Sequence, residues 1–205
     1  MTKKFLASAQ VLGNGRETKE LYRDWASSYD EEISENGYAS PQRVARALVE
    51  CGANLKAPVL DIGCGTGISG LFLKHEGFTE LVGSDFSPEM LALAKEKKVY
   101  EQLVLADLQN PFSFISEPPK TVTAVGVMAP GHAKPALISS VVDIIAPEGL
   151  FAFSLNDHTL RDPGYLALID QLVMNQVIRI RWKEYGDHLP GAGIKALIVV
   201  LEKLQ

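Results

Sequence analysis

Three glycines alternate along the stretch VLDIGCGTG, at Gly63, Gly65 and Gly67, directly after a short apolar run. Glycine lets the backbone turn tightly and lets a ligand approach it closely. The spacing differs from the G-x-G-x-x-G fingerprint of dinucleotide-binding proteins, because Ile68 occupies the position of the third fingerprint glycine. No Gly-Lys-Ser/Thr follows, so the stretch is not a P-loop either. The loop is therefore predicted to bind a ligand other than a pyrophosphate.

Three acids stand at or near the ends of three successive apolar runs: Asp61, Asp85 and Asp107. An acid at position 61 would repel a phosphate and suit an ammonium group. Asp85 can accept hydrogen bonds from both hydroxyls of a ribose, and Asp107 can reach the amino group of an adenine. A ligand with an amine, a ribose and an adenine but no phosphate is S-adenosylmethionine. Each acid also has a simpler interpretation, as a loop brace, a helix cap and a surface acid respectively.

These side chains meet only if the runs that carry them are neighbouring strands. Strands and helices alternate from residue 57 onward, which predicts an α/β fold with a seven-stranded, mostly parallel sheet and helices on both faces. Two final strands without a helix between them predict a C-terminal antiparallel hairpin. Ligands bind such sheets beyond the carboxyl ends of the strands. The expected strands are 57–62, 80–85, 102–107, 121–127, 149–155, 177–185 and 194–203, and the expected helices are 67–77, 87–98, 134–145 and 165–175.

The segment before this alternation has a helical pattern of its own. Leu21, Trp25 and Tyr29 recur at helical spacing over residues 16–32, so they share one face. Such a stripe commonly packs in a core, which is what we expect of Trp25. Tyr22 and Tyr29 have two open interpretations, as core residues or as residues that line the ligand cleft.

A cluster of helix breakers, NGYASP, ends this segment. Ser40 and Pro41 are predicted to cap and open the next helix. We therefore expect an N-terminal helical cap or lid over residues 1–40 and a ligand-binding domain over residues 41–205. A lid of this kind would close over the bound ligand and exclude water.

The chain resembles the class I S-adenosylmethionine-dependent methyltransferases from about Leu21 to Lys203. VLDIGCGTG is similar to their first motif, GSDFSPEML to their acidic ribose loop and LADL to their adenine-side motif. LYRDWASSYD is similar to the W-A-x-x-Y-D helix of several small-molecule methyltransferases, where that helix covers the cofactor. GVMAPGH and FSLNDHTLRDPGY resemble a subgroup related to the Williams–Beuren-region methyltransferase-like proteins. The resemblance implies a Rossmann-like methyltransferase fold, S-adenosylmethionine as cofactor and S-adenosylhomocysteine as product.

The resemblance also implies which residues contact the cofactor. Most lie in the glycine loop or at the ends of the second to fourth strands, and the side chain of Cys64 is expected to serve as a small packing residue. The expected cofactor residues are Tyr22, Tyr29, Asp61, Gly63, Cys64, Gly65, Gly67, Asp85, Phe86, Met90, Ala106, Asp107, Leu108 and Val127.

The acceptor side is less clearly marked. His132 follows the fourth strand, where it has three open interpretations: it orients the substrate, it accepts the substrate's proton, or it caps the next helix. Asn156, His158 and Arg161 follow the fifth strand and are candidates for substrate contact. The family's fourth strand often begins with an acid, as in F-D-x-V, whereas KTVTAVGV has none, so no catalytic acid is expected there. No metal-ligand spacing is present.

Composition and motifs together favour a small-molecule methyl acceptor. The net charge is −5 and the pI is near 5.4, whereas nucleic-acid binders are usually basic. MAPG stands where many amino-methylating enzymes have N/D-P-P-Y/F. We therefore expect no nucleic-acid partner. The longest apolar run near the C-terminus, ALIVVL, is too short to span a membrane, so no membrane partner is expected. The two cysteines, without C-x-x-C, favour the reducing cytoplasm.

Methyl transfer from a sulfonium is an in-line displacement, in which alignment of the partners and exclusion of water supply much of the catalysis. A methyltransferase-like protein that binds the cofactor as a regulator or partner subunit, without catalysis of its own, is the alternative. A nicotinamide oxidoreductase is a third interpretation, against which Ile68 counts.

Overall fold

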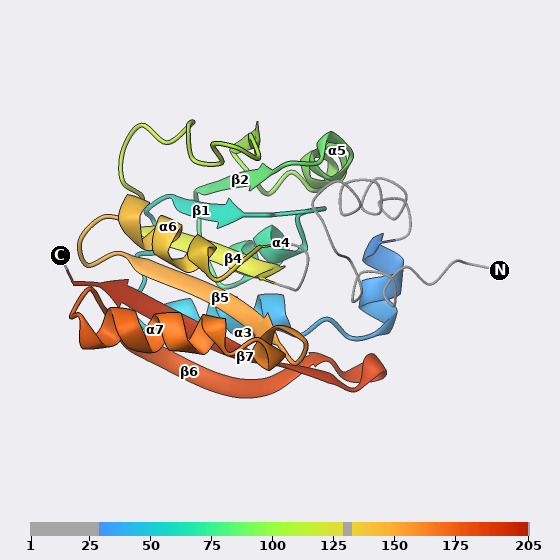
Figure 1. The fold of residues 1–205 in the computed structure, drawn as a ribbon. Helices are drawn as coiled ribbons and strands as arrows, with labels where there is room; N and C mark the ends of the chain where they lie inside the picture. Colours follow the sequence, from blue (N-terminus) through green and yellow to red (C-terminus); the bar gives the residue numbers. More distant parts are fainter. Residues whose placement is uncertain (1–28, 129–132, 205) are drawn as a thin grey trace.

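A seven-stranded sheet forms the middle layer of the protein, in a computed structural model that describes residues 29–128 and 133–204 (Figure 1). The strand order is β3-β2-β1-β4-β5-β7-β6. Strands β1 to β5 run parallel, and β7 runs antiparallel to both β5 and β6, which confirms the predicted C-terminal hairpin. The strands are β1 (Val59–Ile62), β2 (Leu81–Asp85), β3 (Gln102–Leu105), β4 (Thr121–Met128), β5 (Leu150–Asn156), β6 (Ile178–Leu189) and β7 (Ile194–Lys203).

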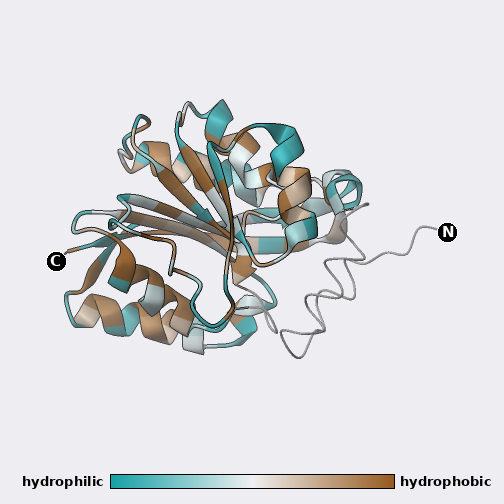
Figure 2. Ribbon diagram, turned by 90° about the horizontal axis from the view of Figure 1, so that it is seen from above, coloured by the Kyte–Doolittle hydropathy of each residue, from teal (hydrophilic) through white to brown (hydrophobic). Residues whose placement is uncertain are grey.

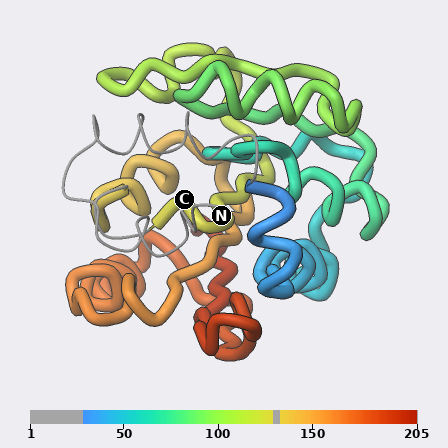
Figure 3. Tube along the Cα trace, turned by 90° about the vertical axis from the view of Figure 1, so that its right-hand side faces the viewer, coloured from blue at the N-terminus to red at the C-terminus, as the bar shows by residue number. Residues whose placement is uncertain are grey.

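Helices cover both faces of the sheet, as the alternating pattern predicts (Figure 3). α6 and α7 bury apolar side chains such as Val142 and Ile169 against one face, and α3 and α4 bury Leu48 and Leu73 against the other. The strands between them are mostly hydrophobic (Figure 2), because they are buried from both sides. The helices are α3 (Ser40–Glu50), α4 (Ile68–His75), α5 (Pro88–Lys97), α6 (Ala136–Ile144) and α7 (Gly164–Met174), with 3₁₀ turns η1 (Thr159–Arg161) and η2 (Pro190–Ala192).

The helices α3 and α5 each have a serine near their start that the sequence marks as a cap, and only one of the two serines caps its helix. Ser87 caps α5 as its sequence predicts, since its hydroxyl accepts a hydrogen bond from the Met90 amide at 3.2 Å. Ser40 does not cap α3, because it already lies inside the helix, which begins after Ala39. The Ser40 hydroxyl instead lies 2.7 Å from Nδ1 of the buried His188. The Ser40 hydroxyl therefore contacts His188, which is distant in the sequence, and not a backbone amide at the start of α3.

Part of the N-terminal prediction falls outside the described residues. Residues 29–35 are helical and immediately precede the turn that leads to α3. Tyr22 and Trp25, and with them most of the expected lid over residues 1–40, lie outside the described ranges. Within those ranges, no helix has both the length and the apolar character needed to cross a membrane.

Candidate functional site

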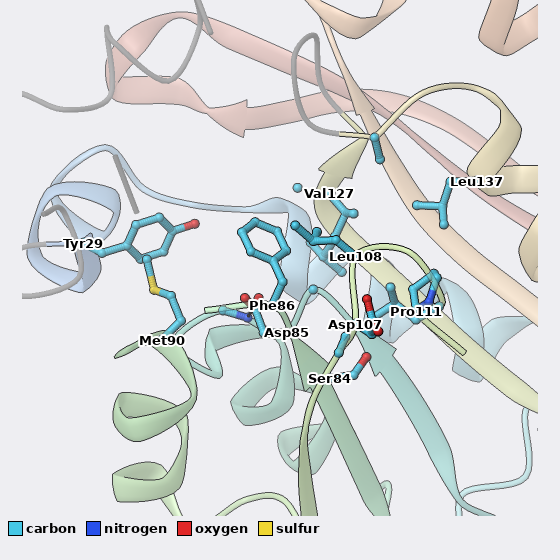
Figure 4. Close-up of a pocket in the computed structure, with 17 residues that line it drawn as sticks. Tyr29, Ser84, Asp85, Phe86, Met90, Asp107, Leu108, Pro111, Val127 and Leu137 are labelled. Atoms are coloured by element: carbon cyan, nitrogen blue, oxygen red, sulfur yellow. Dashed lines mark hydrogen bonds between the residues drawn. The ribbon is translucent and has the colours of Figure 1, made fainter. Parts of the chain in front are cut away.

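A cavity of about 240 Å³ opens at the carboxyl ends of β1 to β4, the position expected for a ligand site in this class of sheet (Figure 4). Its wall carries two acids, and none of the described lining residues is Lys, Arg or His. The lining residues are Tyr29, Ile62, Gly63, Gly65, Ser84, Asp85, Phe86, Met90, Ala106, Asp107, Leu108, Pro111, Val125, Gly126, Val127, Ala133 and Leu137.

The three glycines of the loop have different roles. Gly63 has a φ of 63°, and a Cβ there would lie 2.5 Å from Cγ2 of Val127, so both conformation and space require glycine. Gly65 has a φ of 55° and no atom near the Cβ position, which leaves room for a ligand to approach the backbone. Gly67 does not line the cavity. It packs against Ala94 and Tyr100, so its expected contact with the cofactor is corrected to a packing role.

Asp85 connects the glycine loop to the start of α5. Its Oδ2 accepts a hydrogen bond from the Gly65 amide at 3.0 Å, and its Oδ1 accepts one from the Ser87 amide at 2.9 Å. Desolvation raises the pKa of this largely buried carboxyl, and the backbone donors act in the opposite direction. The carboxylate lines the cavity, and two carboxylate oxygens offer about four acceptor positions, so capacity remains for ribose hydroxyls.

Apolar side chains lie on both sides of Asp85. Phe86 lies in the turn between β2 and α5, Met90 lies in the first turn of α5 and Leu108 follows β3 (Figure 4). Ala106, which also follows β3, lines the cavity as well. Asp107 lies among them, where its Oδ1 accepts a hydrogen bond from the Gln109 amide at 2.8 Å. The cavity thus has flat apolar walls beside a few polar groups, which suits a purine ring.

Asp61 lies outside the cavity, contrary to the expectation that it meets the ammonium group directly. The residue has 0% of its surface exposed. Its carboxylate accepts hydrogen bonds from three hydroxyl groups, those of Ser69 at 2.5 Å, Tyr100 at 2.7 Å and Thr123 at 2.8 Å. Because three internal donors occupy the Asp61 carboxylate, this arrangement does not place it for direct contact with a ligand.

A second, smaller cavity of about 30 Å³ adjoins the first beneath the glycine loop. Tyr29, Gly63, Gly65 and Val125 line both cavities. The remaining walls include hydroxyl groups, and the full lining set is Tyr29, Tyr38, Pro41, Gly63, Cys64, Gly65, Thr66, Ile68, Ser69 and Val125. A polar recess of this size next to the loop could hold a small charged end of a ligand.

Cys64 lies in this smaller cavity with little exposure. Burial raises the pKa of its thiol well above the ordinary range, and the charges of Asp61 and Asp85 add to the effect. A buried thiol of this kind is an unreactive packing group.

The acceptor-side candidates do not come together at the cavity. The Asn156 side chain accepts hydrogen bonds from the amide and the hydroxyl of Thr159, at 2.9 and 3.0 Å, so it braces η1. His158 and Arg161 belong to the same turn, and neither lines the two cavities. His132 lies outside the described residues. The substrate role predicted for Asn156, His158 and Arg161 is therefore not supported by their placement.

An irregularity in β4 shapes the cavity wall instead. The register with β5 shifts between Ala124 and Met128, and Gly126 there has a φ of 73°. The Gly126 amide donates a hydrogen bond to Ser154 Oγ at 2.9 Å. A bulge re-aims the residues around it, and here Val125, Gly126 and Val127 all reach the cavity.

Several lining residues were missed by sequence reasoning. Tyr38 lies within the breaker cluster NGYASP, which was interpreted only as a connection. Leu137 belongs to α6 and Pro111 to the loop after β3, and both lie outside the recognised motifs. No local pattern marks these three residues. Ser84 lies inside the quoted ribose motif GSDFSPEML, directly before Asp85, but it was not among the expected cofactor residues.

Comparison with known proteins identifies the same region. A family profile described as "Methyltransferase domain" matches residues 59–149, from β1 to the start of β5. The chain is 31% identical to human methyltransferase-like protein 27 over 133 residues, which are 63% of this chain and 54% of that protein. It is 29% identical to the putative methyltransferase YqeM of Bacillus subtilis over 142 residues, 66% of this chain and 56% of that protein. The chain thus spans about half the length of these relatives.

The fold also occurs in solved methyltransferases. The magnesium protoporphyrin IX methyltransferase of Synechocystis with bound S-adenosylhomocysteine superposes with a TM-score of 0.65 at 19% identity, covering 90% of this chain and 99% of that one. This likeness supports the fold.

One prediction about partners is wrong. A 56-residue stretch, 27% of this chain and 20% of the relative, is 45% identical to an 18S rRNA (guanine-N(7))-methyltransferase of Bos taurus. A yeast 18S rRNA methyltransferase matches over the same length at 41%. The exclusion of nucleic acid rested on the missing N/D-P-P-Y/F tetrapeptide and on net charge. Net charge sums over the whole chain, whereas nucleic-acid contact depends on the local field of one surface.

The profile match covers β1 to β4, at whose carboxyl ends the cavity opens. The relatives and the shared methyltransferase fold agree with this match, and together they support a class I S-adenosylmethionine-dependent methyltransferase.

Proposed function

We propose that this chain binds S-adenosylmethionine in the main cavity and transfers its methyl group to an acceptor by in-line displacement. The observation that carries the proposal is the buried Asp85 carboxylate, which lines the cavity while it fixes the Gly65 amide at 3.0 Å. The acid that would bind the ribose and an open glycine backbone therefore lie side by side. The absence of Lys, Arg and His from the described lining fits a ligand without phosphates.

For each part of the cofactor, a group of cavity-lining residues has suitable chemistry. Asp85 would hold the ribose hydroxyls, and Phe86, Ala106 and Leu108 would contact the adenine. The smaller cavity, with the hydroxyl groups of Tyr38, Thr66 and Ser69 in its lining, would take the amino-acid end. These assignments use the cavity shapes and the chemistry of their walls.

The chain's own contribution to catalysis is alignment and exclusion of water. The bound cofactor supplies a methyl group activated by a sulfonium. Val125, Gly126 and Val127 form the β4 wall of the cavity, and Ser154 holds this wall in place through the Gly126 amide. Correct alignment of two reactants supplies up to about 7–11 kcal/mol of a barrier, so a dedicated base is not required by default.

The helix formed by residues 29–35 would cover the bound cofactor. Tyr29 lines both cavities, and the neighbouring Asp30 accepts a hydrogen bond from the Thr66 hydroxyl in the glycine loop. Amide hydrogen exchange tests this: residues 29–35 should gain protection on addition of S-adenosylhomocysteine. Equal protection with and without ligand would show a permanently packed helix.

For the acceptor we propose a small molecule, supported by the similarity of LYRDWASSYD to the corresponding helix of small-molecule methyltransferases. A cytoplasmic location is proposed from the two free, buried cysteines, Cys51 and Cys64. Cell fractionation tests the location. Identification of the methyl acceptor requires a screen that includes RNA, because two relatives are rRNA methyltransferases.

The deciding experiment has two stages. Calorimetry should show binding of S-adenosylmethionine and S-adenosylhomocysteine and much weaker binding of NAD; preferential binding of NAD would contradict the proposal. Transfer of a radiolabelled methyl group is then measured in a metabolite library and in RNA as separate arms. Binding without transfer in either arm would favour the alternative of a cofactor-binding regulatory or partner protein.

A further inference from the structure

The ring of Tyr100 lies in a cradle of three glycines next to the cofactor loop. A Cβ at position 70 would lie 2.6 Å from the Tyr100 hydroxyl oxygen, and one at position 83 would lie 3.0 Å from its Cδ1. At position 67 the distance to Cε2 would be 3.2 Å. Atoms in protein interiors are already closely packed, so side chains at these positions would displace the ring. Gly67, Gly70 and Gly83 come from the loop, α4 and β2, and all three leave room for one aromatic side chain.

The hydroxyl group of Tyr100 reaches the buried carboxylate of Asp61. It donates a hydrogen bond to Asp61 Oδ2 at 2.7 Å, and Ser69 Oγ donates to the same oxygen at 2.5 Å. Thr123 Oγ1 donates to Asp61 Oδ1 at 2.8 Å. This one carboxylate thus joins four segments: β1, β4, the first turn of α4 and the segment before β3.

This cluster lies directly behind the cofactor loop without entering the cavity. Asp61 precedes Ile62 and Gly63, both of which line the main cavity, and Ser69 lines the smaller one. Tyr100 lines neither cavity. It can act on a ligand only through its neighbours, which among the described residues include Asp61, the loop residue Gly67 and Ser69, whose Oγ lies 3.5 Å from the Tyr100 hydroxyl.

Asp61 also has no cationic partner in any ion pair found among the described residues. Burial raises the pKa of its carboxyl above the ordinary range, and the hydrogen bonds from Ser69, Tyr100 and Thr123 limit this rise. The hydroxyl donors therefore favour the charged carboxylate, and loss of one donor from a buried charged group is costly.

We propose that Tyr100 is a positioning residue for cofactor binding, which fixes the glycine loop and favours the charged form of Asp61 behind it. The inference rests on the proposed function, because it concerns the same cofactor site. S-adenosylmethionine carries one more positive charge than S-adenosylhomocysteine, so a negative charge behind the loop favours the methyl donor over the product. Tyr100 would thereby act on both the affinity and the selectivity of the site.

The test is Tyr100→Phe, which keeps the ring in its cradle and removes only the hydroxyl donor. We expect the dissociation constant for S-adenosylmethionine, measured by calorimetry, to rise about tenfold. The rise for S-adenosylhomocysteine should be smaller, because that ligand lacks the sulfonium charge. Tyr185→Phe is the matched control, since it also removes a tyrosine-to-aspartate hydrogen bond, at 2.6 Å to Asp157, away from both cavities.

A pH profile separates positioning from simple stabilisation. Without the Tyr100 donor the pKa of Asp61 rises, so Asp61 loses its charge at a higher pH during acidification. Affinity for S-adenosylmethionine should therefore begin to fall at a higher pH in Tyr100→Phe than in the native protein. The other titratable groups that act on this cluster, Cys64 and Asp85, are present in both proteins.

Each outcome has a definite meaning. A native protein that does not bind S-adenosylmethionine would contradict the proposed function itself. A native protein that binds, with unchanged affinity and pH profile in a folded Tyr100→Phe variant, would overturn only the positioning role. If Tyr100→Phe does not fold, Thr123→Val removes a donor from the same carboxylate without disturbing the ring, and the same shifts are expected; unchanged binding there would also overturn the inference.

Discussion

The Asp30 carboxylate accepts a hydrogen bond from the Thr66 hydroxyl at 2.5 Å, which joins the helix of residues 29–35 to the glycine loop. Its other oxygen pairs with Lys97 Nζ at 2.5 Å, at the end of α5. One side chain thus connects three segments around the cavity. The sequence gives no local sign of this contact, because 36 positions separate Asp30 from Thr66.

Asp30→Ala should weaken binding of S-adenosylmethionine about fivefold, because the loop loses the partner of Thr66. The effect is modest since the Asp30 side chain is 45% exposed and solvent screens part of its interactions. Calorimetry checks the change. Glu31→Ala, on the same helix and exposed, is the control and should bind as the native protein does. Equal effects of the two substitutions would argue against the link.

Asp85→Ala should weaken cofactor binding by roughly tenfold to a hundredfold, since hydrogen bonds to a charged group contribute about 1.5–3 kcal/mol each. The fold should survive, because Ser87 retains its cap on α5. Calorimetry and circular dichroism measure the two properties. The exposed Asp170 on α7 provides the matched variant, Asp170→Ala. An unchanged dissociation constant in Asp85→Ala would assign Asp85 to loop bracing alone.

Gly63 and Gly65 should respond differently to alanine. Gly63→Ala should lower the free energy of unfolding by roughly 3 kcal/mol, because a left-handed φ and a contact with Val127 act together. Gly65→Ala should cost only about 1 kcal/mol of stability, since nothing lies near its Cβ, yet it should abolish cofactor binding. Denaturant unfolding and calorimetry give both quantities. Val127→Ala should partly restore the stability of Gly63→Ala; a lack of rescue would rule out the steric explanation.

His188 should make the fold sensitive to acid. Burial lowers its pKa from the ordinary 6.5 to about 4, with the charge of Arg43 adding to the effect. Between these values the unfolded chain binds a proton that the folded chain does not, so stability falls as pH decreases from about 6.5 towards about 4. Over this pH range the free energy of unfolding falls by about 3 kcal/mol.

Denaturant unfolding of the native protein and of His188→Gln across this pH range isolates the contribution, because the acids that also titrate there are common to both. The variant should lack this part of the pH dependence. His75→Gln, at an exposed position on α4, should retain it. Identical slopes for the native protein and His188→Gln would assign the acid sensitivity to other groups.

The sequence by itself determined the elements whose causes are local. The alternation of apolar runs and helical patterns defines the parallel sheet, and the absence of a helix between the last two runs defines the hairpin of β6 and β7. The spacing of Gly63, Gly65 and Asp85 identified a loop and an acid that do line one cavity. These features follow from backbone conformation and from the rule that parallel strands end at one edge.

The tertiary structure decided which groups share a hydrogen bond or a packing contact across long sequence distances. Ser40 would cap a helix in isolation, but His188, 148 positions away, lies closer to its hydroxyl. Asp61 faces Ser69, Tyr100 and Thr123 in place of a ligand, and Gly67 makes room for a ring in place of a cofactor. A buried polar group takes whichever partner the packing brings within about 3 Å, and the sequence pattern does not encode that choice.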